Sequence, residues 1–154
     1  MSKWDTKRIG NITELEVQTY MTKLDVLVSI PYGDRARYDQ IWDVNGRLLR
    51  VQIKYAHEYN NGTIGITCSS GVKRNGKLVR LQYTPEEIDG IATFYKGRVY
   101  YIPVSKIPLK VMSLRFEKTL SNMKSLVNWA SDYEVEKQLN IQMESESERP
   151  LTRS

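Results

Sequence analysis

The sequence predicts a mixed α/β (α+β) fold, in which a mixed sheet is flanked by an N-terminal and a C-terminal helix and carries added β-hairpins. Apolar residues recur at helical spacing over residues 11–24 and again over residues 118–139. Between them lie short strand-like segments joined by Asn-Gly and Lys-Gly turns. A chain of 154 residues buries one core. We therefore expect one domain over residues 1–141 and a polar tail over residues 142–154.

The first helical pattern places most of its apolar residues on one side. Asn11 or Thr13 is available as its N-cap. Glu14 then lies near the positive end of the helix dipole, where an acidic residue is also common for purely structural reasons. The apolar run over residues 25–30 is short and rich in valine and isoleucine, which predicts a buried strand.

Residues 36–56 predict a tight hairpin, because Asn45-Gly46 tolerates the positive backbone angles of a type I′ turn. Side chains in the second arm alternate between two faces of the sheet. One face is apolar, and the other is polar. The apolar set is Leu49, Val51, Ile53 and Tyr55, and the polar set is Arg50, Gln52 and Lys54.

This hairpin brings Asp39, Gln52 and Lys54 to one end of a small sheet. A carboxylate is a hard oxygen ligand for Mg²⁺, and the amide carbonyl and a backbone carbonyl add further oxygens. The Lys54 ammonium could orient or deprotonate a water and stabilise a pentavalent phosphate. The alternative is an ordinary hairpin whose polar side chains face water.

The order of these residues resembles the PD-(D/E)XK nuclease family, which carries an aspartate and an x-K pair on adjacent strands. Residues 10–14 (GNITE) resemble the G-x-x-x-E element of that family, whose glutamate completes the site. The match runs from about residue 8 to residue 56. It implies a restriction-endonuclease-like core with Glu14, Asp39, Gln52 and Lys54 as catalytic residues. Asp39, Glu14 and Gln52 would bind the metal.

Two positions depart from the family pattern. Gln52 stands where most members have Asp or Glu, so one metal-binding charge is missing, and Tyr38 replaces the proline before Asp39. A Q-x-K variant occurs in a branch of small bacterial endonucleases, and the chain is most similar to the group I intron homing type. The resemblance implies Mg²⁺-dependent, site-specific hydrolysis of double-stranded DNA by a homo-oligomer, a dimer or a tetramer. A Holliday junction resolvase, a repair nuclease and a non-catalytic DNA-binding module with a degenerate site are the alternatives.

Basic residues mark two candidate DNA contacts. Arg35 and Arg37 occupy the loop that leads into Asp39, which would place them beside the scissile phosphate. Strands over residues 63–69 and 78–83, joined by a basic tip with a second Asn-Gly, predict a hairpin that can enter a major groove. The alternative for this tip is a solubilising turn. Its candidate contacts are Lys73, Arg74, Lys77 and Arg80.

The remaining segments are expected to have a structural role only. We expect a linker over residues 58–62, a capped turn over residues 84–89, a hairpin over residues 90–104 and a strand over residues 111–116. The apolar stripe of residues 118–139 predicts a helix that covers the sheet.

The amino-acid composition excludes several kinds of site. One cysteine and one histidine exclude an internal disulfide and sites that need several such ligands, and His57 is more simply a loop residue than a general base. Residues 1–110 hold 17 Lys and Arg against 11 Asp and Glu, whereas residues 111–154 hold 6 against 7. The basic surplus therefore lies with the candidate site, as a phosphate-backbone partner requires. The start lacks a secretory signal and no stretch could span a membrane, so we expect a cytoplasmic protein.

Overall fold

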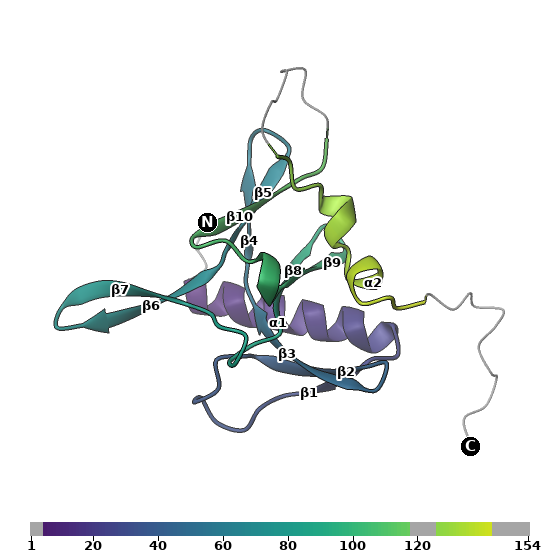
Figure 1. The fold of residues 1–154 in the computed structure, drawn as a ribbon, viewed down its shortest axis with the longest axis horizontal. Helices are drawn as coiled ribbons and strands as arrows, with labels where there is room; N and C mark the ends of the chain where they lie inside the picture. The colour runs from purple at the N-terminus through teal and green to yellow at the C-terminus, as the bar shows by residue number, and fades with distance from the viewer. Residues whose placement is uncertain (1–4, 118–125, 143–154) are drawn as a thin grey trace.

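The computed structural model describes residues 5–117 and 126–142. A five-stranded sheet in the order β1-β2-β3-β8-β9 forms its centre. Only the β3–β8 pair is parallel, so the sheet is mixed, as predicted. Helix α1 (Thr6–Lys23) packs along one face (Figure 1). The strands are β1 (Leu27–Ser29), β2 (Gln40–Val44), β3 (Arg47–Ile53), β8 (Gly90–Tyr95) and β9 (Arg98–Pro103).

Two smaller sheets complete the fold. A three-stranded sheet in the order β10-β5-β4 packs on the other side of β8 and β9. A two-stranded ribbon, β6–β7, projects away from the body at the left of Figure 1. The remaining elements are β4 (Ala56–Tyr59), β5 (Thr63–Thr67), β6 (Ser69–Arg74), β7 (Lys77–Gln82), β10 (Val111–Arg115), the short helices η1 (Val104–Lys106) and η2 (Ala130–Tyr133), and α2 (Val135–Gln138).

The period-2 alternation of β8 and β9 divides the apolar core into two clusters. Ala92 and Tyr101 pack with α1, β2 and β3. Ile91 and Ile102, the next residues along, pack with the three-stranded sheet and η2. In β3 the predicted apolar set behaves the same way, since Leu49, Val51 and Ile53 are buried in the α1 cluster. Tyr55 differs from the prediction: it follows the strand and is 46% exposed.

The predicted turns have the backbone angles that their sequences indicate. Asn45 and Gly46 join β2 to β3 with φ values of 50° and 80°. Asn75 and Gly76 do the same between β6 and β7, as do Lys96 and Gly97 between β8 and β9. Two consecutive positive φ values define the type I′ turn, whose twist suits a tight hairpin.

Helix α1 begins earlier than predicted. Asp5 is its N-cap and accepts a 2.7 Å hydrogen bond from the Arg8 N–H, so neither Asn11 nor Thr13 has that role. Glu14 is consequently in the middle of the helix, not near its positive end. The helix dipole, which acts over the first turn, therefore does not stabilise the Glu14 carboxylate.

Two strand predictions and one linker prediction differ from the structure. The strand expected over residues 25–30 is β1, an edge strand whose Leu27 is 72% exposed, because only one of its sides is paired. Residues 58–62, expected as a linker, partly belong to β4. The basic hairpin forms between β6 and β7, while β5 pairs with β4 and β10.

The predicted C-terminal helix over residues 118–139 is also wrong in length. Residues 118–125 lie outside the described part of the chain. Among residues 126–142 the helical segments are η2 and the four-residue α2. Leu126, expected on the apolar stripe, is 99% exposed. No helix among residues 5–117 and 126–142 has the length and apolar character needed to cross a membrane.

Candidate active site

Asp39 and Gln52 face each other across β2 and β3. The register pairs Gln40 with Val51, and Asp39 extends it by one residue, with its N–H donating to the Val51 carbonyl at 2.9 Å. The Asp39 Oδ2 atom accepts the Ile53 N–H, also at 2.9 Å. The Asp39 carboxylate is thus fixed to the backbone between the two residues of the Q-x-K motif.

Lys54 follows β3 and continues its parallel pairing, since its N–H donates to the Ala92 carbonyl at 2.9 Å. Its Nζ atom lies 5.5 Å from the centre of the Tyr83 ring. The Lys54 ammonium is also near enough to Asp39 to favour the charged carboxylate. Asp39, Gln52 and Lys54 therefore share the face of the sheet that is opposite α1.

Glu14 reaches this site from α1, and Gln40 fixes its position. The Gln40 side chain is fully buried, donates to the Glu14 carbonyl at 2.8 Å and accepts the Trp42 indole N–H at 2.9 Å. Gln40 was not among the site residues predicted from the sequence. A polar residue next to Asp39 at an α1-facing position of a strand was the available signal, because a buried amide needs partners.

Glu14 and Asp39 are both partly buried, and the pKa of each carboxyl group is raised. Burial, followed by the negative charge of Asp39, raises the pKa of Glu14 to about 6. Burial also raises the pKa of Asp39, and the Ile53 N–H and the Lys54 ammonium oppose that rise. Two partly desolvated carboxylates that repel each other form a site where a cation is favourable.

The donor set fits a hard divalent cation. A cation there could be bound by the carboxylate oxygens of Glu14 and Asp39 and by the amide oxygen of Gln52, whose Nε2 donates to the Ile53 carbonyl at 3.4 Å. Mg²⁺ is bound by such oxygens together with water. No group of three His, Cys, Asp or Glu side chains suited to a metal occurs among the described residues.

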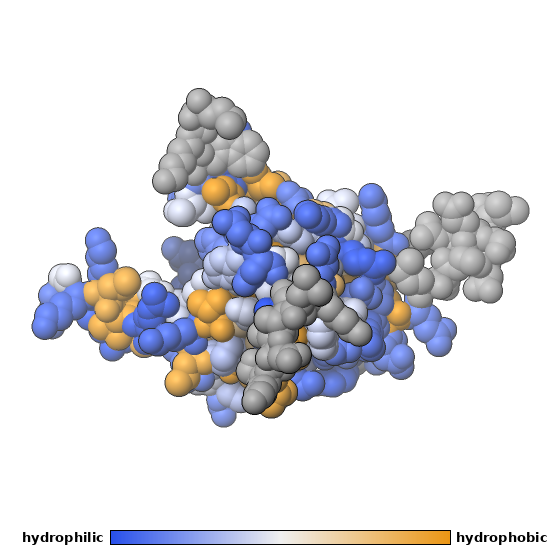
Figure 2. Space-filling model, turned by 90° about the horizontal axis from the view of Figure 1, so that it is seen from above, coloured by the Kyte–Doolittle hydropathy of each residue, from blue (hydrophilic) through white to orange (hydrophobic). Residues whose placement is uncertain are grey.

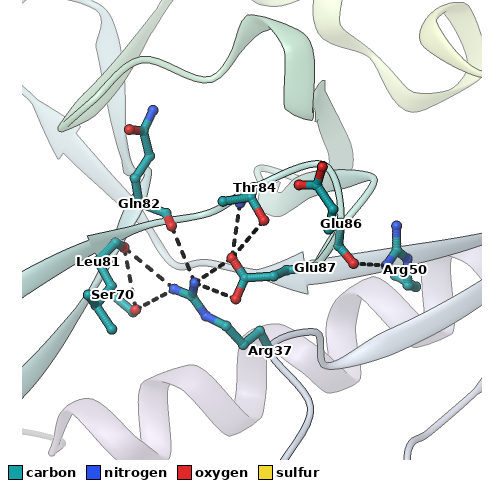
Figure 3. Close-up of polar contacts among 8 residues, drawn as sticks. All are labelled: Arg37, Arg50, Ser70, Leu81, Gln82, Thr84, Glu86 and Glu87. Atoms are coloured by element: carbon teal, nitrogen blue, oxygen red, sulfur yellow. Dashed lines mark hydrogen bonds and ion pairs between the residues drawn. The ribbon is translucent and has the colours of Figure 1, made fainter.

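Arg37, predicted to contact DNA, is held by protein groups (Figure 3). Its guanidinium donates to both carboxylate oxygens of Glu87, at 2.8 and 2.7 Å, and to the Ser70 hydroxyl at 2.7 Å. The same group lies 4.4 Å from the centre of the Tyr83 ring. Arg35, by contrast, is exposed in the loop.

The basic residues of the β6–β7 ribbon are all exposed. Arg74 and Lys77 are directly paired next to the turn, while Lys73 and Arg80 lie on the other face of the ribbon. Figure 2 shows the projecting arm to be largely hydrophilic toward its end, with apolar atoms next to it. The exposed apolar residues of the ribbon are Val72 and Leu78.

His57 lies on β4, not in the loop that was expected, and its side chain is exposed. Its ring makes an edge-on contact with Tyr55, with 5.2 Å between the ring centres. None of the described contacts joins it to Glu14, Asp39 or Lys54, so the site as built does not use it.

The sequence profile of the PD-(D/E)XK endonucleases matches residues 4–136, which is most of the chain. The chain belongs to the PD-(D/E)XK endonuclease family. It is therefore a hydrolase that acts on phosphodiester bonds, and this family generally uses a divalent metal.

This PD-(D/E)XK endonuclease also resembles a solved structure, that of the bacterial homing endonuclease I-Ssp6803I. The TM-score is 0.72 at 22% sequence identity, and the match covers 90% of this chain and 94% of that one. At this identity the likeness shows a shared fold. No curated protein matches the sequence significantly.

Replacing Glu14 with glutamine should stabilise the metal-free endonuclease at pH 8, by about 1 kcal/mol. The folded protein binds the Glu14 proton more tightly than the unfolded chain does, because the pKa rises from 4.5 to about 6. The free energy of unfolding therefore falls as pH rises through this range. At pH 5, which lies between these two pKa values, the Glu14→Gln gain should fall to about half of its pH 8 value or less, and it should vanish only below the unfolded pKa. Urea unfolding in EDTA at both pH values measures it.

The Asp39→Asn background provides the control for this prediction. Removing the Asp39 charge removes one of the two causes of the Glu14 shift. The Glu14→Gln gain at pH 8 should therefore be smaller in that background. An equal gain at pH 5 and pH 8 in the parent protein would contradict the prediction.

Proposed function

We propose that this protein is a site-specific homing endonuclease that hydrolyses phosphodiester bonds of double-stranded DNA with Mg²⁺. The observation that carries the proposal is the convergence of Glu14, Asp39, Gln52 and Lys54 at one end of the central sheet. The fold shared with a bacterial homing endonuclease and the basic β6–β7 ribbon support it.

In this mechanism Glu14 and Asp39 hold the metal with their carboxylates, and Gln52 adds a neutral oxygen. Mg²⁺, when bound there, supplies Lewis-acid stabilisation of the phosphate oxygens. Asp39 is kept in place by the Ile53 N–H, so its carboxylate needs no rearrangement to act as a ligand. Lys54, beside Asp39, orients the attacking water and offsets the negative charge that develops on the phosphate.

Asp39→Asn and Lys54→Ala should each lower the cleavage rate by about 10²- to 10³-fold, because each removes a charge that the transition state needs. DNA affinity should change little. Rates on a cleavable DNA in Mg²⁺, with EDTA as the metal-free reference, measure the effect. The control is Glu117→Gln, which also removes one negative charge, because Glu117 is exposed just after β10 and lies outside the site. Cleavage by Lys54→Ala at the parental rate would refute the assigned role.

Neutralising Lys73, Arg74, Lys77 or Arg80 should each reduce the slope of log affinity against log salt by about 1, because each lost phosphate contact releases one fewer counterion. Fluorescence anisotropy with a DNA duplex at several salt concentrations measures the slope. Lys137→Gln is the control, because Lys137 is paired with Asp132 and belongs to α2, which lies on the opposite side of the molecule from the ribbon (Figure 1). Unchanged slopes for all four ribbon variants would exclude the ribbon from the DNA interface.

The enzyme acts as a homo-oligomer in this proposal, because one chain carries one site and a double-strand break needs two. Leu27 and Leu48 flank Asp43 on the sheet face away from α1, and they are 72% and 69% exposed. They are our candidate contact between copies. Dimers or tetramers should be seen by sedimentation, and Leu48→Lys should yield monomers. Leu109→Lys, equally exposed in a loop, should not. A parent protein that is monomeric even on DNA would refute this part.

The choice of DNA separates homing from the related nuclease activities. A homing enzyme should cut one long linear site, selected from a randomised DNA library, whereas a junction resolvase should cut branched DNA of any sequence. Binding without cleavage in Mg²⁺ would leave the non-catalytic DNA-binding module as the function.

A further inference from the structure

Arg37 connects three segments that are distant in sequence. Its guanidinium contacts the first residues of β6 through Ser70 and the last residues of β7 through the carbonyls of Leu81 and Gln82, at 3.5 and 3.3 Å. It also forms the ion pair with Glu87. Glu87 in turn accepts the N–H and hydroxyl of Thr84, at 3.2 and 3.0 Å, which ties it to the turn after β7 (Figure 3).

These contacts lie at the root of the β6–β7 ribbon. The ribbon is a two-stranded sheet of its own, hydrogen-bonded to neither of the larger sheets, and it projects into solvent (Figure 1). Its direction is therefore set by the groups that hold its root. Arg37 is such a group, and it binds both strands at once.

The other end of this connection is the candidate active site. Arg37 precedes Asp39 by two residues in the chain. The Tyr83 ring, which is buried, lies 4.4 Å from the Arg37 guanidinium and 5.5 Å from the Lys54 ammonium. Arg37 thus packs beside the same ring as Lys54, and in the chain only Tyr38 separates it from Asp39.

We infer that Arg37 is a positioning residue that fixes the β6–β7 ribbon relative to Asp39 and Lys54, so that DNA held by the ribbon is presented to the site in register. The inference rests on the proposed function. It differs from a direct phosphate contact by Arg37, because the guanidinium is already occupied by Glu87, Ser70 and two carbonyls. An error of about 1 Å in such an alignment costs up to about 100-fold in rate.

The Arg37→Lys variant separates a positioning role of Arg37 from a direct contact with phosphate. Lysine keeps the positive charge that a phosphate contact needs, but one ammonium cannot reproduce the bonds to Glu87 and Ser70 together. We expect cleavage of the selected DNA to fall by about 10- to 100-fold. The affinity for a random duplex and its salt slope should stay within about twofold of the parent. Parental cleavage by Arg37→Lys would overturn the inference.

The Glu87→Gln variant distinguishes a positioning role of Arg37 from a direct phosphate contact. If Arg37 positions the ribbon, losing its ion-pair partner should lower cleavage as Arg37→Lys does. The double variant should be no worse than the more impaired single variant, since both break one connection. If Arg37 is a phosphate ligand, releasing it from Glu87 should strengthen DNA binding, and that result would overturn the inference. Arg98→Lys, which weakens the Arg98–Glu134 ion pair elsewhere, is the matched control and should cleave normally.

Hydrogen exchange of the DNA-free protein provides a readout that does not depend on catalysis. In Arg37→Lys and Glu87→Gln, amides at the ribbon root should exchange at least about tenfold faster than in the parent, while those of α1 and β8 should not change. Unchanged exchange at the root overturns the inference whatever the protein cleaves. A parent protein that cleaves no DNA refutes the proposed function, and the exchange result still decides whether Arg37 holds the ribbon.

Discussion

The antiparallel pairing of β2 with β3 is the constraint on which the candidate site depends. Its register places Asp39 opposite Gln52 and lets the Asp39 carboxylate accept the Ile53 N–H. A shift of β2 by one residue would place Asp39 opposite Val51 or Ile53 and turn it toward α1, because directly paired residues share a face of the sheet and side chains alternate along a strand. Burial of the apolar face therefore holds the polar face in place. The same register of β2 and β3 determines the stability of the core and the geometry of the site.

Helix α1 completes the site through a second constraint. Gln40 is buried beneath it and joins the Glu14 carbonyl to the Trp42 indole. A buried amide whose N–H and carbonyl are both hydrogen-bonded fixes the position of the helix along the sheet, because sliding of the helix would leave buried polar groups without partners. This brings Glu14 and Asp39 together despite their repulsion, and the raised pKa of Glu14 reflects that arrangement. A divalent cation would relieve the repulsion, as expected for a PD-(D/E)XK endonuclease.

Polar and charged contacts, not an apolar core, hold the root of the β6–β7 ribbon. The ribbon has little core of its own, so its exposed basic residues need an anchor at the root to act at a defined distance from Asp39. Arg37 and Glu87 are charged residues that replace apolar packing there, and Tyr83 supplies the buried surface against which both cations of this region lie. In the function proposed here, this arrangement would join DNA binding by the ribbon to the candidate site through side chains that need not touch DNA.

Local chemistry in the sequence determined the Asn-Gly turns, the apolar face of β3, the α/β class and the grouping of Asp39 with the Q-x-K motif. Each rests on a backbone preference or a period-2 pattern within a few residues. Tertiary structure alone decided that β5 leaves the basic hairpin to pair with β4 and β10, that α2 is short, and that Arg37 turns to Glu87. The β5–β10 pairing and the Arg37–Glu87 ion pair join residues 44 to 52 positions apart in the chain. The propensities of short strands do not by themselves select one pairing over another, so the packing of the whole core decides it.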